Sequence, residues 1–374
     1  MTHYTERTQC IFCDCDCFHT LWSTPKEISM GCYVIPDTSQ ECVFMPFQIL
    51  ECQACHTFQT KYLGDSKIIY DYNANAHGTI RSSMNEKFAA FVANNPRVSS
   101  IMEIGGGNGG LSELILEKRK DISYTIVDPT YSGSNENRTI VRSFFEDLPE
   151  ESIQSDTIVM SHVFEHFYHP NQILALFQKQ SCIQHIYLNM PDLMNYIRQD
   201  NYHVLNPEHI YYVENEFLMG MFEKYGFETH KYSFHENHSV FYEFSRMQNV
   251  HPPSYPLIQQ TASEEVPLFF ERIEERIQKI NEVLEQHPEK PFYIWPCSMH
   301  TIYLFAMGLN PNKVTAILDN APHKIGQYLY GSKKPCLSFQ SILDGQEESI
   351  VLLNGGCYNS EIKKENYTHI QWIE

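Results

Sequence analysis

Residues 103–110 of this 374-residue chain read EIGGGNGG, and they lie between a short apolar run and an amphipathic one. The run before them, SSIM, predicts a buried strand, and LSELILEKRK after them predicts a helix. Because glycine has no Cβ atom, such a turn lets the backbone approach a ligand closely at the N-terminus of the helix. Gly105, Gly107 and Gly110 match the dinucleotide spacing G-x-G-x-x-G and also the looser glycine turn of class I S-adenosylmethionine (SAM) enzymes. The feature predicts an α/β fold with a cofactor at the end of its first strand.

Two carboxylates lie near the glycine turn, and one of them separates the two candidate cofactors. Asp128 ends the next predicted strand, SYTIVDP, where a carboxylate can accept both ribose hydroxyls of either NAD or SAM. Glu103 ends the first strand, and its charge favours a cationic ammonium and sulfonium over the pyrophosphate of NAD. SAM is therefore the predicted cofactor. In SFFEDLP, Phe144 or Phe145 is a candidate to cover the adenine, with ordinary core packing as the alternative.

Strand and helix patterns alternate over most of the chain, which predicts a mostly parallel sheet with helices on both faces. This alternation closes with two strands, FETHKYSF and HSVFYEFS, that we expect to pair antiparallel. The Pro-rich stretch NVHPPSYPLIQQTAS then marks a boundary. A long helix follows, with apolar residues at helical spacing from Val266 to Leu284, and a second, smaller strand–helix alternation completes the chain. We therefore expect three domains.

Cysteine is concentrated near the N-terminus, where eight of the twelve cysteines lie between Cys10 and Cys55. Such a cluster favours metal binding over a disulfide framework. Cys10/Cys13 and Cys52/Cys55 are two C-x-x-C pairs, and each can present two thiolates to one tetrahedral ion. The intervening cysteines offer alternative pairings, and a redox role is less favoured because no thioredoxin-like pattern surrounds the pairs. We predict one structural Zn²⁺ on these four cysteines.

The net charge and the apolar pattern limit the partners of the chain. A formal net charge of −19 opposes binding to nucleic acid, because a phosphate backbone requires a basic surface. The first residues, MTHYTERTQC, lack the apolar region of a signal peptide, and no apolar run reaches the length of a membrane span. We therefore predict a cytoplasmic protein that acts on a small molecule and binds neither membrane nor nucleic acid.

Residues 162–166, HVFEH, match the H-x-x-E-H motif of zinc proteases. They follow the predicted strand SDTIVMS directly, and Pro170 argues against a long helix. The carboxyl ends of strands are where α/β sheets bind ligands. We therefore interpret His162 and His166 as residues that line the cofactor and active site rather than as zinc ligands, whereas His169 is explained as an ordinary loop histidine.

In this order, the motifs resemble those of the bacterial nucleotide-sugar C-methyltransferases that build 3-C-methyl branched deoxysugars. The matching stretches are the two cysteine pairs, YDYNANAHGTIRSSMNEKF, MEIGGGNGG, HVFEHF, NPEHIYYVENEFLMGMFEKYGF and LDNAPHKIGQYLYGSKKP. The resemblance implies a class I SAM-methyltransferase, Rossmann-like domain at 67–250. It also implies a four-cysteine zinc domain at 1–66 and a smaller α/β (Rossmann-like) domain at 251–374 that helps to bind substrate.

The resemblance also implies roles for individual residues. Tyr72 corresponds to a tyrosine at the cofactor, and His166 to a histidine of the active site. Glu208 and His209 correspond to a pair credited with base chemistry, in which His209 is the base and Glu208 orients it or stabilises its cation. His166 would then stabilise an enolate oxygen. Asn206 stands where the family has a tyrosine, and it is expected to contribute a hydrogen bond.

The predicted function is therefore SAM-dependent C-methylation of a nucleotide-linked keto-deoxysugar through an enolate. Because Asn206-Pro207 departs from the tyrosine and histidine of the family, O-methylation of a sugar for a surface polysaccharide or natural product stays open. Two further alternatives are an NAD-dependent sugar oxidoreductase, which the glycine spacing permits, and a non-catalytic binding protein with a zinc-stabilised segment.

Overall fold

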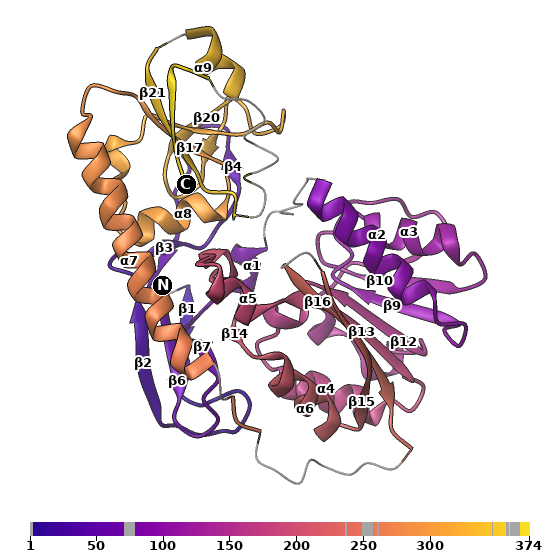
Figure 1. Ribbon diagram of the computed structural model, residues 1–374. Coiled ribbons are helices and arrows are strands. Elements are labelled where there is room, and N and C mark those ends of the chain that lie inside the picture. The colour runs from indigo at the N-terminus through magenta and orange to yellow at the C-terminus, as the bar shows by residue number, and fades with distance from the viewer. Residues whose placement is uncertain are drawn as a thin grey trace.

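The computed structural model describes residues 3–70, 79–235, 238–248, 257–259, 262–345, 347–356, 359 and 367–374. Two seven-stranded sheets form the centres of two lobes, and strands of the N-terminal segment contact both lobes (Figure 1). The long helix α7 (Ala262–Gln286) runs along the N-terminal segment towards the C-terminal lobe (Figure 1). Its predicted apolar face from Val266 to Leu284 is buried against both of them.

The first sheet has the strand order β11-β10-β9-β12-β13-β16-β15. Its neighbouring strands are parallel except at β16, which is antiparallel to both β13 and β15, as predicted for the closing pair. This order confirms the predicted Rossmann-like, class I SAM-methyltransferase fold. The strands are β9 (Ser100–Ile104), β10 (Ser123–Val127), β11 (Thr139–Val141), β12 (Thr157–Ser161), β13 (His185–Pro191), β15 (Phe227–His235) and β16 (Ser239–Arg246).

Helices cover both faces of this sheet because successive strand side chains point to opposite sides. Ile101 packs on the face covered by α2 and α3, whereas Met102 packs on the face covered by α4 and α6 (Figure 1). The carboxyl ends of the central strands therefore stay accessible to loops. The helices of this part of the chain are α2 (Thr79–Ala93), α3 (Gly110–Lys118), α4 (Pro170–Lys179), α5 (Leu193–Arg198) and α6 (Asn215–Lys224).

The second sheet has the order β22-β21-β17-β18-β20-β19-β4. The first five strands are parallel, and β19 is antiparallel to both of its neighbours. This is the smaller α/β unit predicted for the C-terminal third. Its elements are β17 (Phe292–Trp295), α8 (Met299–Ala306), β18 (Ala316–Leu318), β19 (Tyr328–Leu329), β20 (Lys334–Leu337), α9 (Phe339–Gly345), β21 (Ser349–Leu353) and β22 (Ile370–Ile373).

The N-terminal segment contributes strands to its neighbours as well as to itself. Its strand β4 (Val34–Ile35) extends the C-terminal sheet, and its strand β7 (Phe58–Thr60) pairs with β14 (Tyr211–Tyr212). Both pairings cross the predicted domain boundaries, which themselves stay a prediction. The other elements of the segment are β1 (Tyr4–Glu6), β2 (Phe18–Ser23), β3 (Ile28–Ser29), β5 (Phe44–Met45), β6 (Gln48–Cys52), β8 (Tyr62–Gly64) and α1 (Ser66–Ile69).

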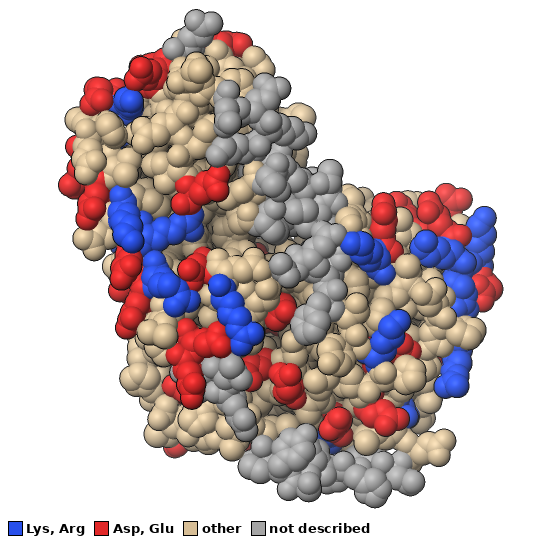
Figure 2. Space-filling model, viewed as in Figure 1, with Lys and Arg blue, Asp and Glu red and all other residues tan. Residues whose placement is uncertain are grey.

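The surface carries charges of both signs. Figure 2 shows Lys and Arg side chains interspersed with Asp and Glu, and several basic side chains gather on the left, over the region in which Figure 1 places α7. The predicted absence of a nucleic-acid partner stays a prediction. Within the described part of the chain, no helix has the length and apolar character that a membrane span requires.

Candidate active site

The four predicted cysteine ligands lie together at one end of the N-terminal segment. The Sγ atom of Cys10 lies 3.6 Å from that of Cys55, and the Sγ atom of Cys13 lies 3.6 Å from that of Cys52. All four sulfurs lie within 4.8 Å of one another. A tetrahedron with Zn–S bonds of about 2.3 Å has edges of about 3.8 Å, so the sulfur positions fit one zinc ion. Four thiolates leave no coordination position open, which suits a structural ion.

The backbone around each cysteine pair is shaped for such an ion. Each pair is followed by a left-handed residue, Asp14 with φ 61° or His56 with φ 57°. The amide of Asp14 donates to the carbonyl of Cys10 at 3.0 Å, and the amide of His56 donates to that of Cys52 at 2.9 Å. Nε2 of Gln59 donates to Sγ of Cys10 at 2.9 Å. Such a donor stabilises a thiolate, as metal binding requires.

The glycine turn has the predicted conformation and packs against the loop that carries the histidines. Gly105 has φ 77° and Gly107 has φ 55°, in the left-handed region that glycine adopts without strain. A Cβ atom on Gly105 would lie 2.3 Å from Cγ2 of Val163, so no larger residue fits there. The helix α3 begins at Gly110. The turn therefore lies directly beside the loop that follows β12.

Glu103 and Asp128 are both buried beside the turn. Asp128 accepts hydrogen bonds from the amides of Gly107 at 2.8 Å and Thr130 at 2.7 Å, which fix its carboxylate at the end of β10. The hydroxyl of Tyr124 donates to Glu103 at 2.9 Å. Burial raises the pKa of Glu103 to about 7, although the Tyr124 hydrogen bond opposes the shift. The two carboxylates fit the ribose and the cationic part of SAM.

The aromatic candidates for the cofactor site separate into different environments. Phe145 is 3 % exposed and packs in the core against Phe167 and Phe177, so its ring is not available to an adenine. Phe144 is half-buried, and its ring centroid lies 6.2 Å from that of Tyr70, so it remains a candidate. Tyr72 lies outside the described residues.

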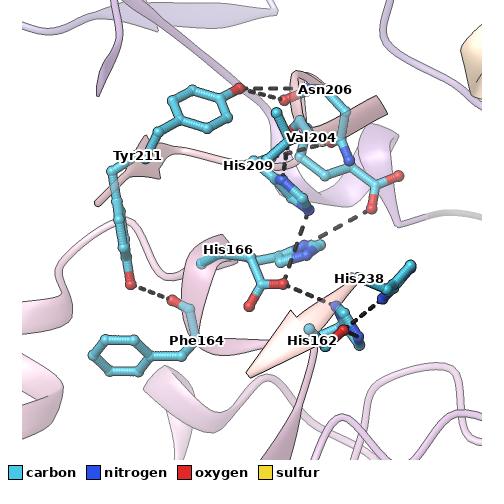
Figure 3. A network of polar contacts seen from close by, with 12 residues as sticks. His162, Phe164, His166, Val204, Asn206, His209, Tyr211 and His238 are labelled. Carbon is cyan, nitrogen blue, oxygen red and sulfur yellow. Dashed lines mark hydrogen bonds and ion pairs between the residues drawn. The ribbon is translucent and has the colours of Figure 1, made fainter. Parts of the chain in front are cut away.

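His162 and His166 lie on an irregular loop and not on one helix, as the sequence predicted. The chain turns at His162, which has φ 55°, and then forms a single 3₁₀ turn, η3 (Phe164–His166). The amide of His162 donates to the carbonyl of Asn189 at 2.8 Å, which anchors the loop to β13. Figure 3 shows the side chains of His162 and His166, from this loop, and of His209, from a separate segment, converging on one region.

His209 is held in one orientation and one tautomer. Its Nδ1 lies 2.8 Å from the carbonyl oxygen of Val204 (Figure 3). Because a carbonyl only accepts, Nδ1 carries the proton and Nε2 carries the lone pair. Oδ1 of Asn206 accepts from the amides of Glu208 at 2.7 Å and His209 at 3.1 Å. The oxygen of Asn206 therefore shapes the turn that presents the Glu208–His209 pair.

Glu208 faces His166 rather than His209. Its Oε2 lies 3.8 Å from Nδ1 of His166, and the same nitrogen lies 2.6 Å from the hydroxyl oxygen of Tyr70. The carboxylate beside Nε2 of His209 belongs to Glu165, with its Oε1 at 3.9 Å. The geometry therefore assigns to Glu165 the position beside the base that the sequence interpretation gave to Glu208.

Burial favours the uncharged forms of these groups. It lowers the pKa of His166 to about 3 and also lowers the pKa of His209, and in both cases the charge of Glu165 opposes the shift. Burial, and then the nearby Glu165, raise the pKa of Glu208 to about 7. The two imidazoles are therefore neutral near neutral pH, so each has a nitrogen lone pair to offer.

Three residues near this cluster were missed by sequence reasoning. Glu165 lies inside the quoted HVFEH motif but received no role of its own. Tyr70 contacts His166, and Oγ of Ser239 lies 3.3 Å from Nε2 of His162. A carboxylate between two histidines was a usable signal for Glu165. Tyr70 and Ser239 reach the site only because distant segments of the chain meet there.

Comparisons with known proteins place this site in a methyltransferase domain. The family model described as a methyltransferase domain matches residues 74–232. This match and the order of the first sheet confirm the predicted enzyme class, a methyltransferase with the SAM-dependent fold. No curated protein sequence matches the chain significantly. The finer assignment to the nucleotide-sugar C-methyltransferases stays a prediction.

Solved structures with similar folds are distant. The pyocyanin biosynthetic protein PhzM has 12% identity and a TM-score of 0.35, and the match covers 44% of this chain and 55% of PhzM. A complex of the Haloferax volcanii Trm112 methyltransferase activator with a putative methyltransferase has 12% identity and a TM-score of 0.36, over 45% of this chain and 94% of that one. The N-terminal domain of EvdMO1, with SAH and D-fucose, has 12% identity and a TM-score of 0.33. That match covers 46% of this chain and 85% of the EvdMO1 domain chain.

The cysteine geometry predicts one tightly held zinc per chain. Elemental analysis of protein purified without chelator and dialysed against metal-free buffer should give one equivalent. Cys52→Ser should lose the ion and about 2–4 kcal/mol of unfolding free energy, because binding of a structural ion contributes directly to folding. Cys182→Ser, outside the cluster, is the matched control and should retain the ion. Wild-type protein without zinc would contradict the assignment.

The raised pKa of Glu103 predicts pH-dependent SAM binding. Only the ionised carboxylate attracts the cations of SAM, so affinity should rise about tenfold from about pH 6 to about pH 8 as Glu103 ionises near 7. The charged and titratable groups that act on Glu103 are Tyr124, Asp128 and Arg138. Calorimetric titration measures the SAM affinity at each pH. In the Glu103→Gln variant, the affinity should no longer rise with pH. An equal slope in this variant would contradict the assignment of the pH dependence to Glu103.

Proposed function

We propose that the chain transfers the methyl group of SAM to a carbon atom of a nucleotide-linked keto-deoxysugar, by way of an enolate. The observation that carries the proposal is the fixed orientation of His209, whose unprotonated Nε2 is aimed into the buried cluster. The contact between Gly105 and Val163 brings the loop that bears His162 and His166 against the glycine turn where SAM is expected. An acceptor in contact with these histidines would therefore lie close to the methyl donor.

The proposed reaction begins with removal of a proton from the carbon next to the ketone. Nε2 of His209 takes this proton, and the C–H electron pair forms the enolate. The nearby carboxylate of Glu165, 3.9 Å from Nε2, stabilises the imidazolium that results. SAM supplies an electrophilic methyl group. The enolate carbon forms the new C–C bond as the bond from methyl to sulfur breaks, which leaves S-adenosylhomocysteine.

A pair of groups is placed to stabilise the enolate oxygen. The Tyr70 hydroxyl oxygen lies 2.6 Å from Nδ1 of His166, and both side chains are half-buried. A hydrogen-bond donor held in a fixed position stabilises a developing oxyanion without the reorganisation that water requires. Glu208 adds a carboxylate on the far side of this pair, 3.8 Å from His166. Its role in the proposal is to orient His166.

The C-terminal lobe is the proposed second wall of the acceptor site. The rings of His203 and His300 stack with centroids 3.5 Å apart and planes 5° apart, which joins the loop before the Glu208–His209 pair to α8. The side-chain amide of Asn354 donates to the carbonyl of His300 at 2.9 Å, so the carboxyl end of β21 lies at the same junction. A nucleotide sugar between the lobes would be within reach of both units.

Replacement of His209 tests the base assignment. His209→Gln should lower turnover about 10²–10⁴-fold, the usual contribution of a general base, while leaving SAM affinity unchanged. His169→Gln is the matched control, because His169 is an exposed histidine of the same region. Turnover should be followed by the appearance of S-adenosylhomocysteine and SAM affinity by calorimetry. Undiminished turnover in His209→Gln would rule out this residue as the base.

Isotope exchange distinguishes C-methylation from O-methylation. With a nucleotide-linked 4-keto-6-deoxy sugar and S-adenosylhomocysteine in D₂O, the C–H hydrogen next to the ketone should exchange with solvent, because enolate formation does not require methyl transfer. Nuclear magnetic resonance of the recovered sugar measures the exchange, which should be lost in His209→Gln. Two results together would instead establish O-methylation. The keto sugar would show no exchange, and a reduced sugar that lacks the ketone would be methylated.

A further inference from the structure

Glu165 is a buried carboxylate without ordinary hydrogen-bond partners. The residue is 2 % exposed, and neither of its carboxylate oxygens has a hydrogen bond within the described structure. Its nearest polar contacts are Nδ1 of His162 at 3.4 Å and Nε2 of His209 at 3.9 Å, both at Oε1. A buried carboxylate loses its hydration and normally regains that energy through hydrogen bonds, an ion pair or a metal ion. The site therefore has an unmet requirement for positive charge.

Two imidazoles stand beside this carboxylate with donor atoms in range of a single ion. One ligand atom from each of Glu165, His166 and His209 lies within 4.8 Å of the other two. Bonds of about 2.0–2.1 Å from a tetrahedral zinc ion to nitrogen and oxygen place such atoms about 3.3 Å apart. The pair of Glu165 and His209, at 3.9 Å, would need to close by roughly 0.6 Å. Rotation of the side chains can supply a shift of this size.

Both histidines also have the outer contacts that metal-binding histidines require. In His209 the carbonyl of Val204 accepts from Nδ1, which leaves Nε2 as the free donor towards Glu165. In His166 the Nδ1 atom contacts the hydroxyl of Tyr70 at 2.6 Å. Bonds of this kind fix the ring orientation and tautomer of histidine ligands. The donor set is thus held by the surrounding structure before any ion binds.

We infer that Glu165, His166 and His209 bind a divalent transition-metal ion reversibly and that the bound ion inhibits methyl transfer. Two imidazoles and one carboxylate form a donor set that suits zinc and its neighbours in the first transition row, rather than magnesium, which prefers oxygen ligands. This second ion is separate from the one proposed on the four cysteines. The inhibitory part rests on the proposed function, in which His209 is the base.

Inhibition follows from the single lone pair of His209. Nδ1 is occupied by its hydrogen bond to Val204, so Nε2 is the one nitrogen available for either a proton or a metal ion. An ion on Nε2 therefore prevents His209 from accepting the proton of the acceptor. Three protein ligands leave a coordination position open, and a water molecule at this position would fill the space next to Nε2 of His209 that the acceptor needs. Inhibition should accordingly compete with the acceptor and not with SAM.

Calorimetry tests the site without any need for activity. Zn²⁺ is titrated into protein that already holds one equivalent, in the absence of SAM and acceptor, and one further equivalent should bind. Glu165→Gln and His166→Gln should each weaken this second binding by at least about tenfold, because each removes one of three ligands. Glu151→Gln, an exposed carboxylate, is the matched control. Absence of a second equivalent, or unchanged binding in both ligand variants, would overturn the inference.

An activity assay tests the inhibitory role separately. Added Zn²⁺ should raise the apparent KM for the acceptor, leave that for SAM unchanged, and be reversed by a chelator too weak to remove the cysteine-bound ion. Stimulation by Zn²⁺ would overturn both inhibition and the base assignment of His209, while the metal site itself would stand. An enzyme without turnover on any keto sugar would overturn the proposed function and leave the calorimetric result unaffected.

Discussion

The short pairing between β7 and β14 is the contact on which the arrangement of the site depends. Tyr211 and Tyr212 add to the edge of the N-terminal sheet directly after the Glu208–His209 turn. Arg7, buried at 7 % exposure, donates from Nε to the carbonyl of Thr60 at 2.8 Å and lies 3.5 Å from the carbonyl of Ile210. The cysteine-rich segment thus holds the loop that presents His209. A segment too small to form a large core would gain rigidity from an ion bound by its four clustered cysteines.

A chain of contacts also links the first cysteine pair, through Tyr211, to Glu165. The ring of Phe12, inside the first C-x-x-C pair, lies 5.0 Å from the ring of Tyr211, and the Tyr211 hydroxyl donates to the carbonyl of Phe164 at 2.5 Å. Phe164 immediately precedes Glu165, whose own carbonyl accepts from the amide of Ile210 at 3.0 Å. The loops that carry Glu165 and His209 are therefore fixed to each other and to the four-cysteine segment. If the predicted zinc ion holds this segment together, its loss should disturb the arrangement of Glu165 and His209 without touching the glycine turn.

The predictable parts of this chain are those that strong local patterns specify. The glycine turn, the closing antiparallel pair and the helix from Val266 to Leu284 have periodicities or compositions that few other structures share. The strands β4 and β14 have two residues each, which is too short to show an alternation of apolar and polar residues. Their partner strands also lie far away in the sequence. Their pairing depends on tertiary contacts alone. For this reason the sequence indicated three separate units where the structure has strands shared between them.

In the candidate site, the sequence likewise predicted some residues but not the contacts between them. His166 and His209 were predicted because their motifs end strands or follow a family pattern, but the partner of each histidine was not. Adjacent residues in a tight turn point apart, so the carboxylate next to His209 in sequence reaches His166, and Glu165 from a different loop reaches His209. A buried carboxylate without hydrogen bonds costs several kcal/mol of stability, and such a cost is typical of sites where charge serves chemistry. Glu165 lies 3.9 Å from Nε2 of His209, so in the two proposals either a proton or a metal ion on this nitrogen supplies the missing charge, and the two compete for it.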